Sequence, residues 1–585
     1  MKTQLKLMVF GGIKMQKQEE KVLIWGAGKI GRGFIADLFS EANYHITFAD
    51  NSDVLVKKLK ANKKYNLFKL LSENESDKVT IKSFDAIHTS EIDNLQCLLD
   101  EISLMALVVF PNAFDEVGEA LAEGIIKRAN NNVNKPLDIL VCTNIMHPTA
   151  KLKESIVKHL DDDMKVYYEK YIGLAECLVI RMAVQPQKKL IEEDELVVVT
   201  NGYPELIVDQ TAFKGKLPNI KGLIFTDKIE AEEQRKMFTY NMVHALYSYI
   251  GITKGYEFVY ECTRDEEVNQ IAKYALDEIG QGLIKEFGFS EEDMARWNQR
   301  VLKNMANPIL KDKLVRVGGD PIRKLKRTDR LTGAALLCRK NGIMPYYLAK
   351  AIGYGYLFCN QDDNSSMKIH KYVKMYGLKN AVLEYSQLNQ EPDIVQLIFA
   401  HYRRAIEGEP LSQNVNVINK IKQAYTSGFN AELKYRGCGQ CALIGMFEVL
   451  NIEDAGLFQA ASGLSGGMAL YNDGACGGYN GGILLMGKFV GRKLDRMRID
   501  GDKEDQYRSF TMAQKLHDKF IETYGSVVCK DIHNRIFGEW FCLKEKKDRD
   551  RFEDAGAHKD KCTSVIANSC AWITEILIEE GFIKL

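Results

Sequence analysis

The sequence lacks any excess of charge of one sign. Its 585 residues include 79 Lys and Arg residues and 79 Asp and Glu residues, so the formal net charge is zero. Such a chain has no overall electrostatic attraction to nucleic acid or to an anionic membrane, and we expect neither as a partner. The chain also lacks internal repeats and any apolar run of the ~18 residues that would cross a bilayer. These absences predict a cytoplasmic protein of several domains, because 585 residues exceed one core. They leave its oligomeric state open.

A glycine-rich turn near the N-terminus has the spacing of a dinucleotide-binding loop. The apolar run VLIW leads into Gly26-x-Gly28-x-x-Gly31, and an amphipathic segment and a second apolar run follow. In such a strand–turn–helix–strand unit, the first glycine makes the tight turn and the second lets the backbone approach a pyrophosphate. The third lets the helix pack on the strand. The pyrophosphate then lies at the helix N-terminus, where free N–H groups favour an anion.

The second apolar run ends at Asp50, and this residue favours NAD over NADP. A carboxylate there accepts hydrogen bonds from ribose hydroxyls, whereas it would repel a 2′-phosphate. No arginine follows immediately to accommodate that phosphate. Asn144 follows the apolar run LDILVC, at the edge where open α/β sheets bind ligands. The predicted cofactor-binding residues are Gly26, Gly28, Lys29, Ile30, Gly31, Asp50 and Asn144.

Changes in the apolar pattern divide the chain into segments. Short runs such as VTIKSF, LMALVVF and LDILVCTN alternate with helix-like segments, which predicts strands of a parallel sheet. A helical pattern follows, and EGEPLSQNVN then interrupts it. We expect an α/β Rossmann-type domain, an all-α substrate domain and a C-terminal, mainly α-helical, cysteine-rich domain. The predicted segments are a flexible leader (1–20), the NAD-binding domain (21–195), the helical domain (196–405), a linker (406–415) and the cysteine-rich domain (416–585).

A lysine, an asparagine and a histidine recur at helical spacing in EEQRKMFTYNMVHALYSYIG. In an α-helix, Asn241 would lie about 140° and His244 about 80° from Lys236, so the three side chains could meet one substrate. A lysine in an apolar pocket can take a hydroxyl proton while hydride leaves the same carbon. An amide and an imidazole can hold the oxygen as it becomes a carbonyl. Spacing alone fits equally well a surface lysine beside a core asparagine and histidine.

Residues 21 to about 400 resemble the polyol-specific long-chain dehydrogenases, and among them the mannitol-1-phosphate 5-dehydrogenases. The matching stretches include WGAGKIGRGFIADLF, ITFAD, FKGKLPNI, RKMFTYNMVHALYSYIG and NPILKDKLVRVGGDPIRKLKRTDRL. The resemblance implies an NAD-binding domain followed by an all-helical substrate domain. It also implies Lys236 as the general acid/base, with Asn241 and His244 positioning the oxyanion.

A basic run in RVGGDPIRKLKRTDRL suits a substrate phosphate, because arginine can bind phosphate bidentately. Arg323 and Lys324 are the preferred candidates, and a solvated helix face with ion pairs is the alternative. A second motif, Tyr346-x-x-x-Lys350, matches the short-chain dehydrogenase pair. It lies far beyond the nucleotide-binding unit, which favours coincidence. No cysteine and histidine set in the first 400 residues suits catalytic zinc.

Some positions depart from the family that the chain resembles. Close members have Glu-Asn followed by an arginine where this chain has Thr143-Asn144 and His147. Glu176 and Ile180 replace two family aspartates, although Arg181 is retained. These departures leave the sugar open: a related hexitol phosphate, an unphosphorylated polyol or a hexuronate remains an alternative.

Seven of the thirteen cysteines fall in the last 150 residues, which in a reducing compartment suggests redox or metal chemistry. They are Cys438, Cys441, Cys476, Cys529, Cys542, Cys562 and Cys570. Thiols at a helix N-terminus are expected to have a lowered pKa. Residues 412–585 resemble the redox-active family named for its C_GCAxxG_C_C cysteine pattern. Disulfide exchange, an iron–sulfur cluster, zinc with help from histidines, and buried structural cysteines all remain open.

The sequence thus predicts an NAD-dependent oxidoreductase that interconverts mannitol 1-phosphate and fructose 6-phosphate, fused to a thiol-redox or metal-binding module. The expected partner is a small sugar phosphate or polyol. Another class of function stays open, namely a non-catalytic NAD(H)-binding sensor that reports to the cysteine module. The substitutions at Thr143 and Ile180 favour that sensor, whereas the intact Lys236 opposes it.

Overall fold

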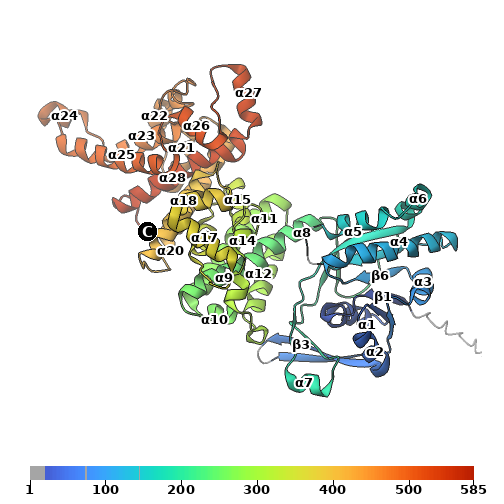
Figure 1. Cartoon of the computed structure of the whole chain (residues 1–585). Coiled ribbons are helices and arrows are strands. Elements are labelled where there is room, and N and C mark those ends of the chain that lie inside the picture. The colour runs from blue at the N-terminus through green and yellow to red at the C-terminus, as the bar shows by residue number, and fades with distance from the viewer. Residues whose placement is uncertain (1–19, 73–74, 144, 146) are drawn as a thin grey trace, which may run out of the picture. The chain divides into compact units, whose positions relative to one another are not determined.

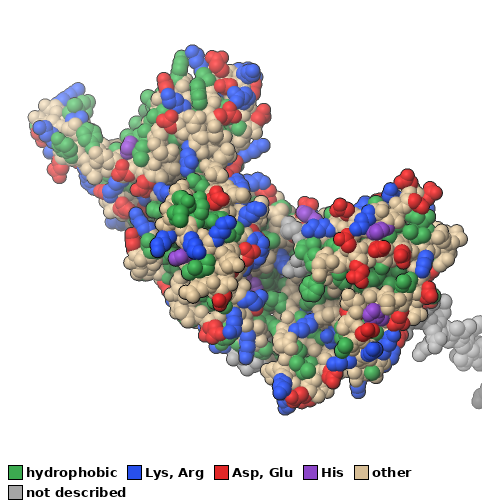
Figure 2. Space-filling model, viewed as in Figure 1, with side chains coloured by type: hydrophobic (Ala, Val, Ile, Leu, Met, Phe, Trp, Pro, Cys, Tyr) green, Lys and Arg blue, Asp and Glu red, His purple; other side chains and the backbone are tan. Residues whose placement is uncertain are grey.

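The computed structural model describes residues 20–585 except 73–74, 144 and 146. These residues form two compact units, the first ending at Glu233 and the second beginning at Gln234. The leader predicted at 1–20 lies outside the described residues, apart from Glu20. No described helix is both long and apolar enough to cross a membrane. Figure 2 shows basic and acidic side chains interspersed over the visible face, in keeping with the zero net charge.

An eight-stranded sheet forms the centre of the first unit (Figure 1), in the order β12-β11-β8-β7-β6-β1-β2-β5. Neighbouring strands run parallel except β8 and β11, which are antiparallel. The strands are β1 (Lys21–Trp25), β2 (His45–Asp50), β5 (Asp85–His88), β6 (Leu104–Leu107), β7 (Leu137–Val141), β8 (Ile172–Leu178), β11 (Leu206–Asp209) and β12 (Leu223–Thr226). β6 and β7 are buried along their whole length, as a parallel sheet covered on both faces requires.

Both faces of this sheet carry an apolar core. Successive side chains of a strand point to opposite faces, so Val22 and Ile24 contribute to one core while Leu23 and Trp25 contribute to the other. The covering helices are α1 (Ala36–Glu41), α2 (Asp53–Asn62), α3 (Ile92–Glu101), α4 (Phe114–Asn130), α5 (Pro148–Val157) and α6 (Asp162–Tyr171). The short helix α7 (Lys188–Glu193) has no buried residue. The α/β fold predicted from the sequence is confirmed.

One predicted strand belongs to a different sheet. VTIKSF was expected in the parallel sheet, but it lies largely in β4 (Glu75–Lys82), which pairs antiparallel with β3 (Lys64–Ser72). These strands join β10 (Val198–Thr200) and β9 (Ala183–Val184) in a four-stranded sheet. Only one residue of β4 is buried, so its alternating pattern reflects a hairpin with one face toward solvent.

The first part of the second unit is helical, but it begins later than the predicted start at 196, because β10, β11 and β12, between residues 198 and 226, belong to the first unit. Helix α8 (Ile229–Lys236) contains the boundary between the units, and a π-helical turn (Met237–Asn241) follows it. The further helices are α9 (Met242–Thr253), α10 (Val259–Arg264), α11 (Glu266–Phe287), α12 (Glu291–Met305), α13 (Leu314–Gly318), α14 (Pro321–Lys324), α15 (Thr332–Lys340), α16 (Tyr346–Leu357), α17 (Asn364–Tyr376), α18 (Leu378–Ala381) and α19 (Pro392–Ile406).

The cysteine-rich region is also helical and completes the second unit. Its helices are α20 (Val415–Tyr435), α21 (Cys438–Leu450), α22 (Ala455–Ala460), α23 (Gly477–Val490), α24 (Leu494–Asp500), α25 (Lys503–Tyr524), α26 (Cys529–Phe537), α27 (Lys546–Asp554) and α28 (Cys562–Glu579). Helices α20, α21 and α28 approach closely where Gly428 and Gly445 face Cys570. A Cβ atom at Gly428 would lie 2.7 Å from the Cys570 Sγ, so a larger residue would separate the helices.

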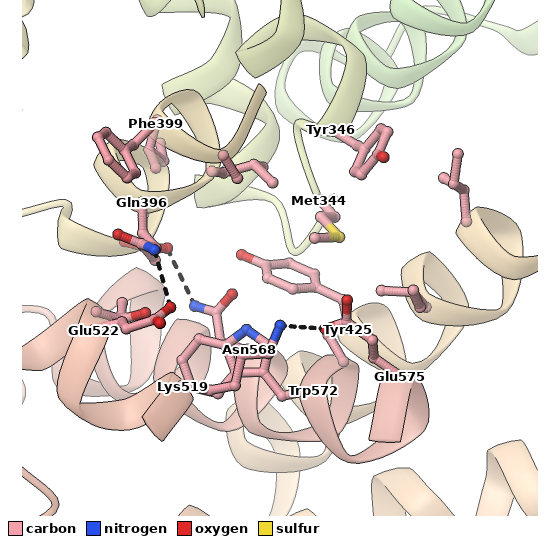
Figure 3. A pocket seen from close by; sticks show the side chains of 18 of the residues that line it. Met344, Tyr346, Gln396, Phe399, Tyr425, Lys519, Glu522, Asn568, Trp572 and Glu575 are labelled. Carbon is pink, nitrogen blue, oxygen red and sulfur yellow. Dashed lines mark hydrogen bonds and ion pairs between the residues drawn. The ribbon is translucent and has the colours of Figure 1, made fainter. Parts of the chain in front are cut away.

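A buried ion pair joins the two parts of the second unit. The guanidinium of Arg339 on α15 contacts Asp393 at 2.9 Å and Asp560, just before α28, at 3.1 Å. A groove of about 730 Å³ lies beside this contact, between α16 and α19 on one side and α25 and α28 on the other (Figure 3). Gln396 bridges it by donating to Glu522 at 3.2 Å.

Candidate functional sites

The glycine loop after β1 has the geometry that its sequence predicts. Gly26 adopts φ +105°, and a Cβ there would lie 2.2 Å from the Val108 carbonyl oxygen. A Cβ at Gly31 would lie 2.0 Å from the Gly26 oxygen, so this glycine allows the helix to approach the turn. A Cβ at Gly28 would meet nothing within 4 Å. The backbone at Gly28 therefore borders open space, which a dinucleotide pyrophosphate fits.

Asp50 is held in place at the end of β2. One of its carboxylate oxygens accepts a hydrogen bond from the Ala27 N–H at 2.8 Å, and the other accepts one from the Ser52 N–H at 2.9 Å. The side chain is only half-buried, so remaining lone pairs can accept from ribose hydroxyls. The loop and the acidic residue thus lie together, as a dinucleotide site requires.

The other predicted cofactor residues are less informative. The ammonium of Lys29 donates to Gln185 at 2.7 Å on the surface, and Ile30 packs partly against the core. Asn144 lies outside the described residues, although Thr143 before it is buried and donates to the Val109 carbonyl at 3.0 Å. Arg32, which sequence reasoning did not single out, is buried and fastens the loop by donating to the Ala27 carbonyl at 2.7 Å.

The three predicted catalytic residues belong to one helical segment, and each is partly exposed. Lys236, Asn241 and His244 are each half-buried. Their buried neighbours are Phe238, Thr239, Tyr240, Met242, Val243, Ala245 and Leu246. The segment between Lys236 and Asn241 is a π-helix rather than the expected α-helix. The hydrogen bonds of a π-helix join residues five apart, so Lys236 and Asn241 are separated by about one turn. Their side chains are therefore closer in direction than the separation of about 140° that an α-helix implies.

An aspartate that sequence reasoning missed lies beside His244. The His244 Nε2 lies 3.5 Å from the Asp312 Oδ2, and both side chains are largely buried. Burial alone would raise the pKa of Asp312, but the nearby His244 and Arg316 outweigh it and lower that pKa. The carboxylate therefore holds the imidazole in one orientation. Nothing in the sequence around Asp312 signals the pairing, because it comes from a loop before α13 that is distant along the chain.

The two predicted phosphate residues have different surroundings. Arg323 is half-exposed and pairs with Asp320 at 2.9 Å. Lys324 is buried, and its ammonium donates to the carbonyls of Val317 and Gly319. Burial, followed by the nearby Arg330 and Arg323, lowers the pKa of Lys324 to about 8. In this arrangement Lys324 holds backbone, and Arg323 is the more accessible cation.

Three polar groups near the carboxyl edge of the first sheet lie together. His147, Glu176 and Glu233 each have a ligand atom within 4.8 Å of the others. Glu176 is buried and accepts from Thr149 at 3.1 Å, while its second oxygen has no hydrogen-bond partner in the described structure. One imidazole and two carboxylates can bind a divalent cation or accept hydrogen bonds from sugar hydroxyls. Sequence reasoning noted two of these residues separately and missed Glu233.

Family positions around this cluster have structural roles. Arg181 is buried, and its guanidinium donates to Asp37 at 2.7 Å and to the Gly33 carbonyl at 3.0 Å. It thereby fixes the helix that follows the glycine loop. Ile180, which replaces an expected carboxylate, is buried in the apolar core.

Four cysteines of the C-terminal region line one cavity of about 240 Å³. These cavity thiols are Cys438, Cys476, Cys529 and Cys562. The other three predicted candidates lie elsewhere: Cys441 and Cys570 are buried between helices, and Cys542 is partly exposed outside the cavity lining. His533 and His558 also line the cavity, whereas His517 does not. The fold thus separates the seven cysteines into two groups that sequence spacing did not distinguish.

The expectation of a lowered thiol pKa at a helix N-terminus is wrong for these cysteines. Burial raises the pKa of Cys476 to about 11 and that of Cys438 to about 12, and it also raises the pKa values of Cys529 and Cys562 well above the ordinary value. Neighbouring thiols add to the rise in pKa at Cys438, Cys529 and Cys562 by charge repulsion. Desolvation outweighs the helix dipole, so free thiols here are poor nucleophiles at neutral pH.

The rival tyrosine–lysine pair stabilises the segment between the two helical regions. Tyr346 lies at the groove of Figure 3 and donates to Gln413, while Lys350 donates to the Leu411 carbonyl. The groove contains none of the three predicted catalytic residues. Tyr346 and Lys350 therefore have structural partners, consistent with a coincidental motif.

The chain thus combines a doubly covered sheet that has a glycine loop with a helical region that contains Lys236, Asn241 and His244. Family models match both parts. The model "Mannitol dehydrogenase Rossmann domain" matches residues 20–222, and "Mannitol dehydrogenase C-terminal domain" matches residues 228–427. "Putative redox-active protein (C_GCAxxG_C_C)" matches residues 437–576. The chain therefore contains both domains of a mannitol dehydrogenase and a C-terminal C_GCAxxG_C_C domain.

Solved structures show the same fold for the first two thirds of the chain. A D-sorbitol dehydrogenase in substrate-free form has a TM-score of 0.56 at 14% identity, covering 67% of this chain and 94% of its own. A Pseudomonas fluorescens mannitol 2-dehydrogenase, in a ternary complex with NAD and D-mannitol, has a TM-score of 0.52 at 15% identity, covering 67% and 93%.

Proposed function

We propose that the chain is an NAD-dependent oxidoreductase that interconverts a hexitol phosphate and a ketose phosphate, with mannitol 1-phosphate and fructose 6-phosphate as its pair. The observation that carries this proposal is the partial exposure of Lys236, Asn241 and His244 on an otherwise buried helical segment. Side chains of these three types, partly exposed on one helical segment, can bind a polyol and move its hydroxyl proton. The mannitol dehydrogenase domains support the reaction class.

Residues of the first unit would hold the cofactor. Gly26 and Gly31 shape the turn, Gly28 leaves the space for the pyrophosphate, and Asp50 accepts from the adenosine ribose. When bound, NAD supplies the acceptor for the hydride that leaves the alcohol carbon. The carboxylate at Asp50 supports NAD over NADP, because it repels a 2′-phosphate.

The three predicted catalytic residues would carry the proton chemistry. In polyol oxidation, the Lys236 amine takes the hydroxyl proton as the C–H bond breaks, and in ketose reduction its ammonium returns that proton. The Asn241 amide and the His244 imidazole donate to the oxygen that alternates between hydroxyl and carbonyl. The Asp312 Oδ2 lies 3.5 Å from the His244 Nε2, so the carboxylate orients the imidazole.

The substrate's phosphate is the finer part of the proposal. Arg323 is the accessible cation of the predicted pair, whereas Lys324 is bonded to backbone carbonyls. An unphosphorylated polyol or a hexuronate is the alternative substrate class. The likeness to a mannitol 2-dehydrogenase that binds D-mannitol makes the free polyol the first alternative to test.

A direct assay tests the proposal. NADH formation is measured with mannitol 1-phosphate, mannitol, sorbitol and hexuronates, for the wild type and for Lys236→Ala. We expect turnover with mannitol 1-phosphate and a loss of about 10³-fold in kcat in the variant. Lys228→Ala, an exposed lysine of the same segment, is the matched control and should keep full activity. Equal activity of Lys236→Ala and wild type would contradict the catalytic role.

A second candidate function is an NAD(H)-binding sensor without turnover. The buried Thr143 and Ile180 favour it, because neither position offers the carboxylate that the resembling enzymes have. Saturable NADH binding together with no turnover on any of these substrates would support the sensor. For the C-terminal domain, we propose a thiol-redox or metal-binding module.

A further inference from the structure

Each cavity thiol lies at the start of a helix. Cys438, Cys529 and Cys562 are the first residues of α21, α26 and α28, and Cys476 caps α23. Three helix N-termini, those of α21, α23 and α26, therefore converge on one apolar cavity, although the cysteines are widely separated along the chain. Cys562 lies where a π-helical turn (Ala557–Lys561) runs into α28, and its N–H donates to the Ala557 carbonyl. Helix N-termini present free N–H groups and a positive dipole end, which together favour an anionic group.

Glycines bring the thiols together around a shared loop. The Gly466 N–H donates to the Cys438 Sγ at 3.5 Å, and a Cβ on the adjacent Gly467 would lie 2.7 Å from the Cys529 Cβ. A Cβ at Gly477, next to Cys476, would lie 2.3 Å from the Cys438 Sγ. The loop and the start of α23 are thus tightly packed between the thiols. Any side chain at Gly467 or Gly477 would push them apart.

The loop after Gly467 is held in an unusual backbone conformation. Met468, Ala469 and Leu470 have φ values of +68°, +50° and +68°, in the left-handed region that L-residues avoid. This conformation has a cost in free energy, because it brings the Cβ atom close to the following carbonyl oxygen. Gly466 and Leu470 both line the cavity, so this cost is concentrated at its wall. Strain of this kind persists where the surrounding structure or a function requires it.

The thiols are too far apart for a single metal ion. Tetrahedral zinc with bonds of about 2.3 Å places its sulfur ligands about 3.8 Å from one another. Among the residues that the structure describes, no three donor atoms of the cavity's cysteines and histidines lie within 4.8 Å of one another. All the cysteines are free thiols. The cavity volume of about 240 Å³ is much more than one ion fills.

Hydrogen-bond donors already point at the sulfurs. Besides Gly466, the N–H groups of Gly478 and Tyr479 bond to Cys476, and the Asn472 amide donates to the Cys529 Sγ at 3.5 Å. Donors of this kind stabilise cluster-bound thiolates and adjust their potential. In the absence of a metal they have only neutral thiols as acceptors.

Two polar side chains in the cavity wall have unused atoms. His533 is 2% exposed, and its Nδ1 has no hydrogen-bond partner in the described structure, while its Nε2 lies 3.6 Å from the Cys529 Sγ. Glu432 is also 2% exposed, and one of its oxygens has no partner there. Unpaired buried polar atoms are costly, so they indicate a polar or charged group that the cavity accepts.

We propose that the four cavity thiols together hold one iron–sulfur cluster. The inference rests on the proposed function of the C-terminal domain and selects cluster binding over disulfide exchange and mononuclear zinc. Four thiolates are the usual ligand set of such clusters, and a cluster of several irons separates its ligands more than one ion does. The N-termini of α21, α23 and α26 offset part of the negative charge that the bound thiolates carry.

The test uses the full-length chain, produced with iron and sulfide available and purified without oxygen. Iron, zinc and acid-labile sulfide are measured per chain, together with the absorption spectrum and the EPR signal after dithionite reduction. We expect about two to four irons with matching sulfide per chain, and a reducible spectrum. Single Cys→Ala variants of the cavity thiols should lose at least ~10-fold in bound iron.

Cys542→Ala is the matched control, because Cys542 belongs to the same domain but not to the cavity. It should keep the cluster. Far-UV circular dichroism and NADH turnover show whether each variant folds, and turnover also tests the dehydrogenase separately. Stoichiometric zinc without iron, a disulfide between two cavity thiols in metal-free protein, or iron retained in the Cys→Ala variants would each overturn the proposal.

Discussion

The predicted dehydrogenase residues and the thiol cavity are built in opposite ways. Lys236, Asn241 and His244 come from one short continuous helical segment. The cavity thiols come from the starts of four helices between residues 438 and 562, and only the packing of those helices brings them together. A site of the first kind survives moderate changes in packing, whereas a site of the second kind depends on every helix contact.

The two sites also differ in their relation to solvent. The dehydrogenase residues are partly exposed, and the Asp312 carboxylate beside them has a lowered pKa because a cationic partner outweighs burial. The thiols are buried, and desolvation raises their pKa values. The first site is therefore suited to proton transfer with a substrate. The second is suited to a group that displaces the thiol protons on binding.

The largest loss of stability is expected where the two regions join. Arg339→Ala removes the guanidinium that pairs with Asp393 and Asp560. The buried Asp393 carboxylate then lacks this cationic partner. We expect a loss of about 3–5 kcal/mol in the free energy of unfolding, because an uncompensated buried charge remains. Urea unfolding followed by circular dichroism measures it. Lys340→Ala, which breaks only a surface pair with Glu286, should cost less than about 1 kcal/mol. Equal losses in both variants would refute the buried role.

Two glycines of α23 test whether the thiol cavity depends on close helix packing in a way that the dehydrogenase residues do not. Gly477→Ala places a Cβ 2.3 Å from the Cys438 Sγ, whereas Gly487→Ala on the same helix meets nothing within 4 Å. We expect Gly477→Ala to lose the bound iron and about 1–3 kcal/mol of stability from overpacking. Gly487→Ala should keep the iron and gain up to about 1 kcal/mol in helix propensity. NADH turnover should be unchanged in both. Iron retained in Gly477→Ala would show that the helices need not approach so closely.

The His244–Asp312 contact gives the dehydrogenase side a pH dependence. A carboxyl whose folded pKa lies below its ordinary 3.8 adds stability above pH ~4, and that stability is lost as the pH falls through the folded value. Asp312→Asn should therefore lower the free energy of unfolding by about 1 kcal/mol at pH 7. The difference from wild type should shrink below pH ~4. Thermal melts from pH 3 to 7 measure it. A difference that is constant over this range would exclude the ion pair as its source.

The smallest expected effect concerns the His147–Glu176–Glu233 cluster. The proposed proton transfer uses Lys236 and requires no metal, so EDTA should leave NADH turnover unchanged while the C-terminal iron is monitored in the same sample. Loss of turnover that Zn²⁺ or Mn²⁺ restores would assign a cation to this cluster. Glu176→Gln would then abolish the restoration.

Patterns that repeat over short distances were readable from the sequence. The glycine loop, its strand and Asp50 form a contiguous unit, and the structure gives each glycine the surroundings that its place in the motif predicts. The lysine, asparagine and histidine are partly exposed on one helical segment, although a π-helical turn replaces the expected α-helix between the first two. Hydrogen bonding within one turn is not visible in side-chain spacing, which is why the sequence predicted a regular α-helix.

Contacts between distant segments could not be read in the same way. VTIKSF has the alternation of a strand, but its partner strand was ambiguous, and the structure pairs it in a hairpin outside the parallel sheet. Asp312 and Glu233 carry no local signal of their partners. The sequence spacing of the seven cysteines did not distinguish those that face the cavity from the others. Burial and helix packing decided which four face the cavity.

By itself, the sequence determined the class of fold, the glycine loop and the helical segment that contains the predicted catalytic residues, because each depends on residues within a few turns of one another. Only the tertiary structure decided that four thiols from different helices meet at one cavity, that desolvation outweighs the helix dipole at the thiols, and that Lys324 binds backbone. These outcomes depend on distances between segments far apart in the chain, and on the exclusion of water when those segments pack.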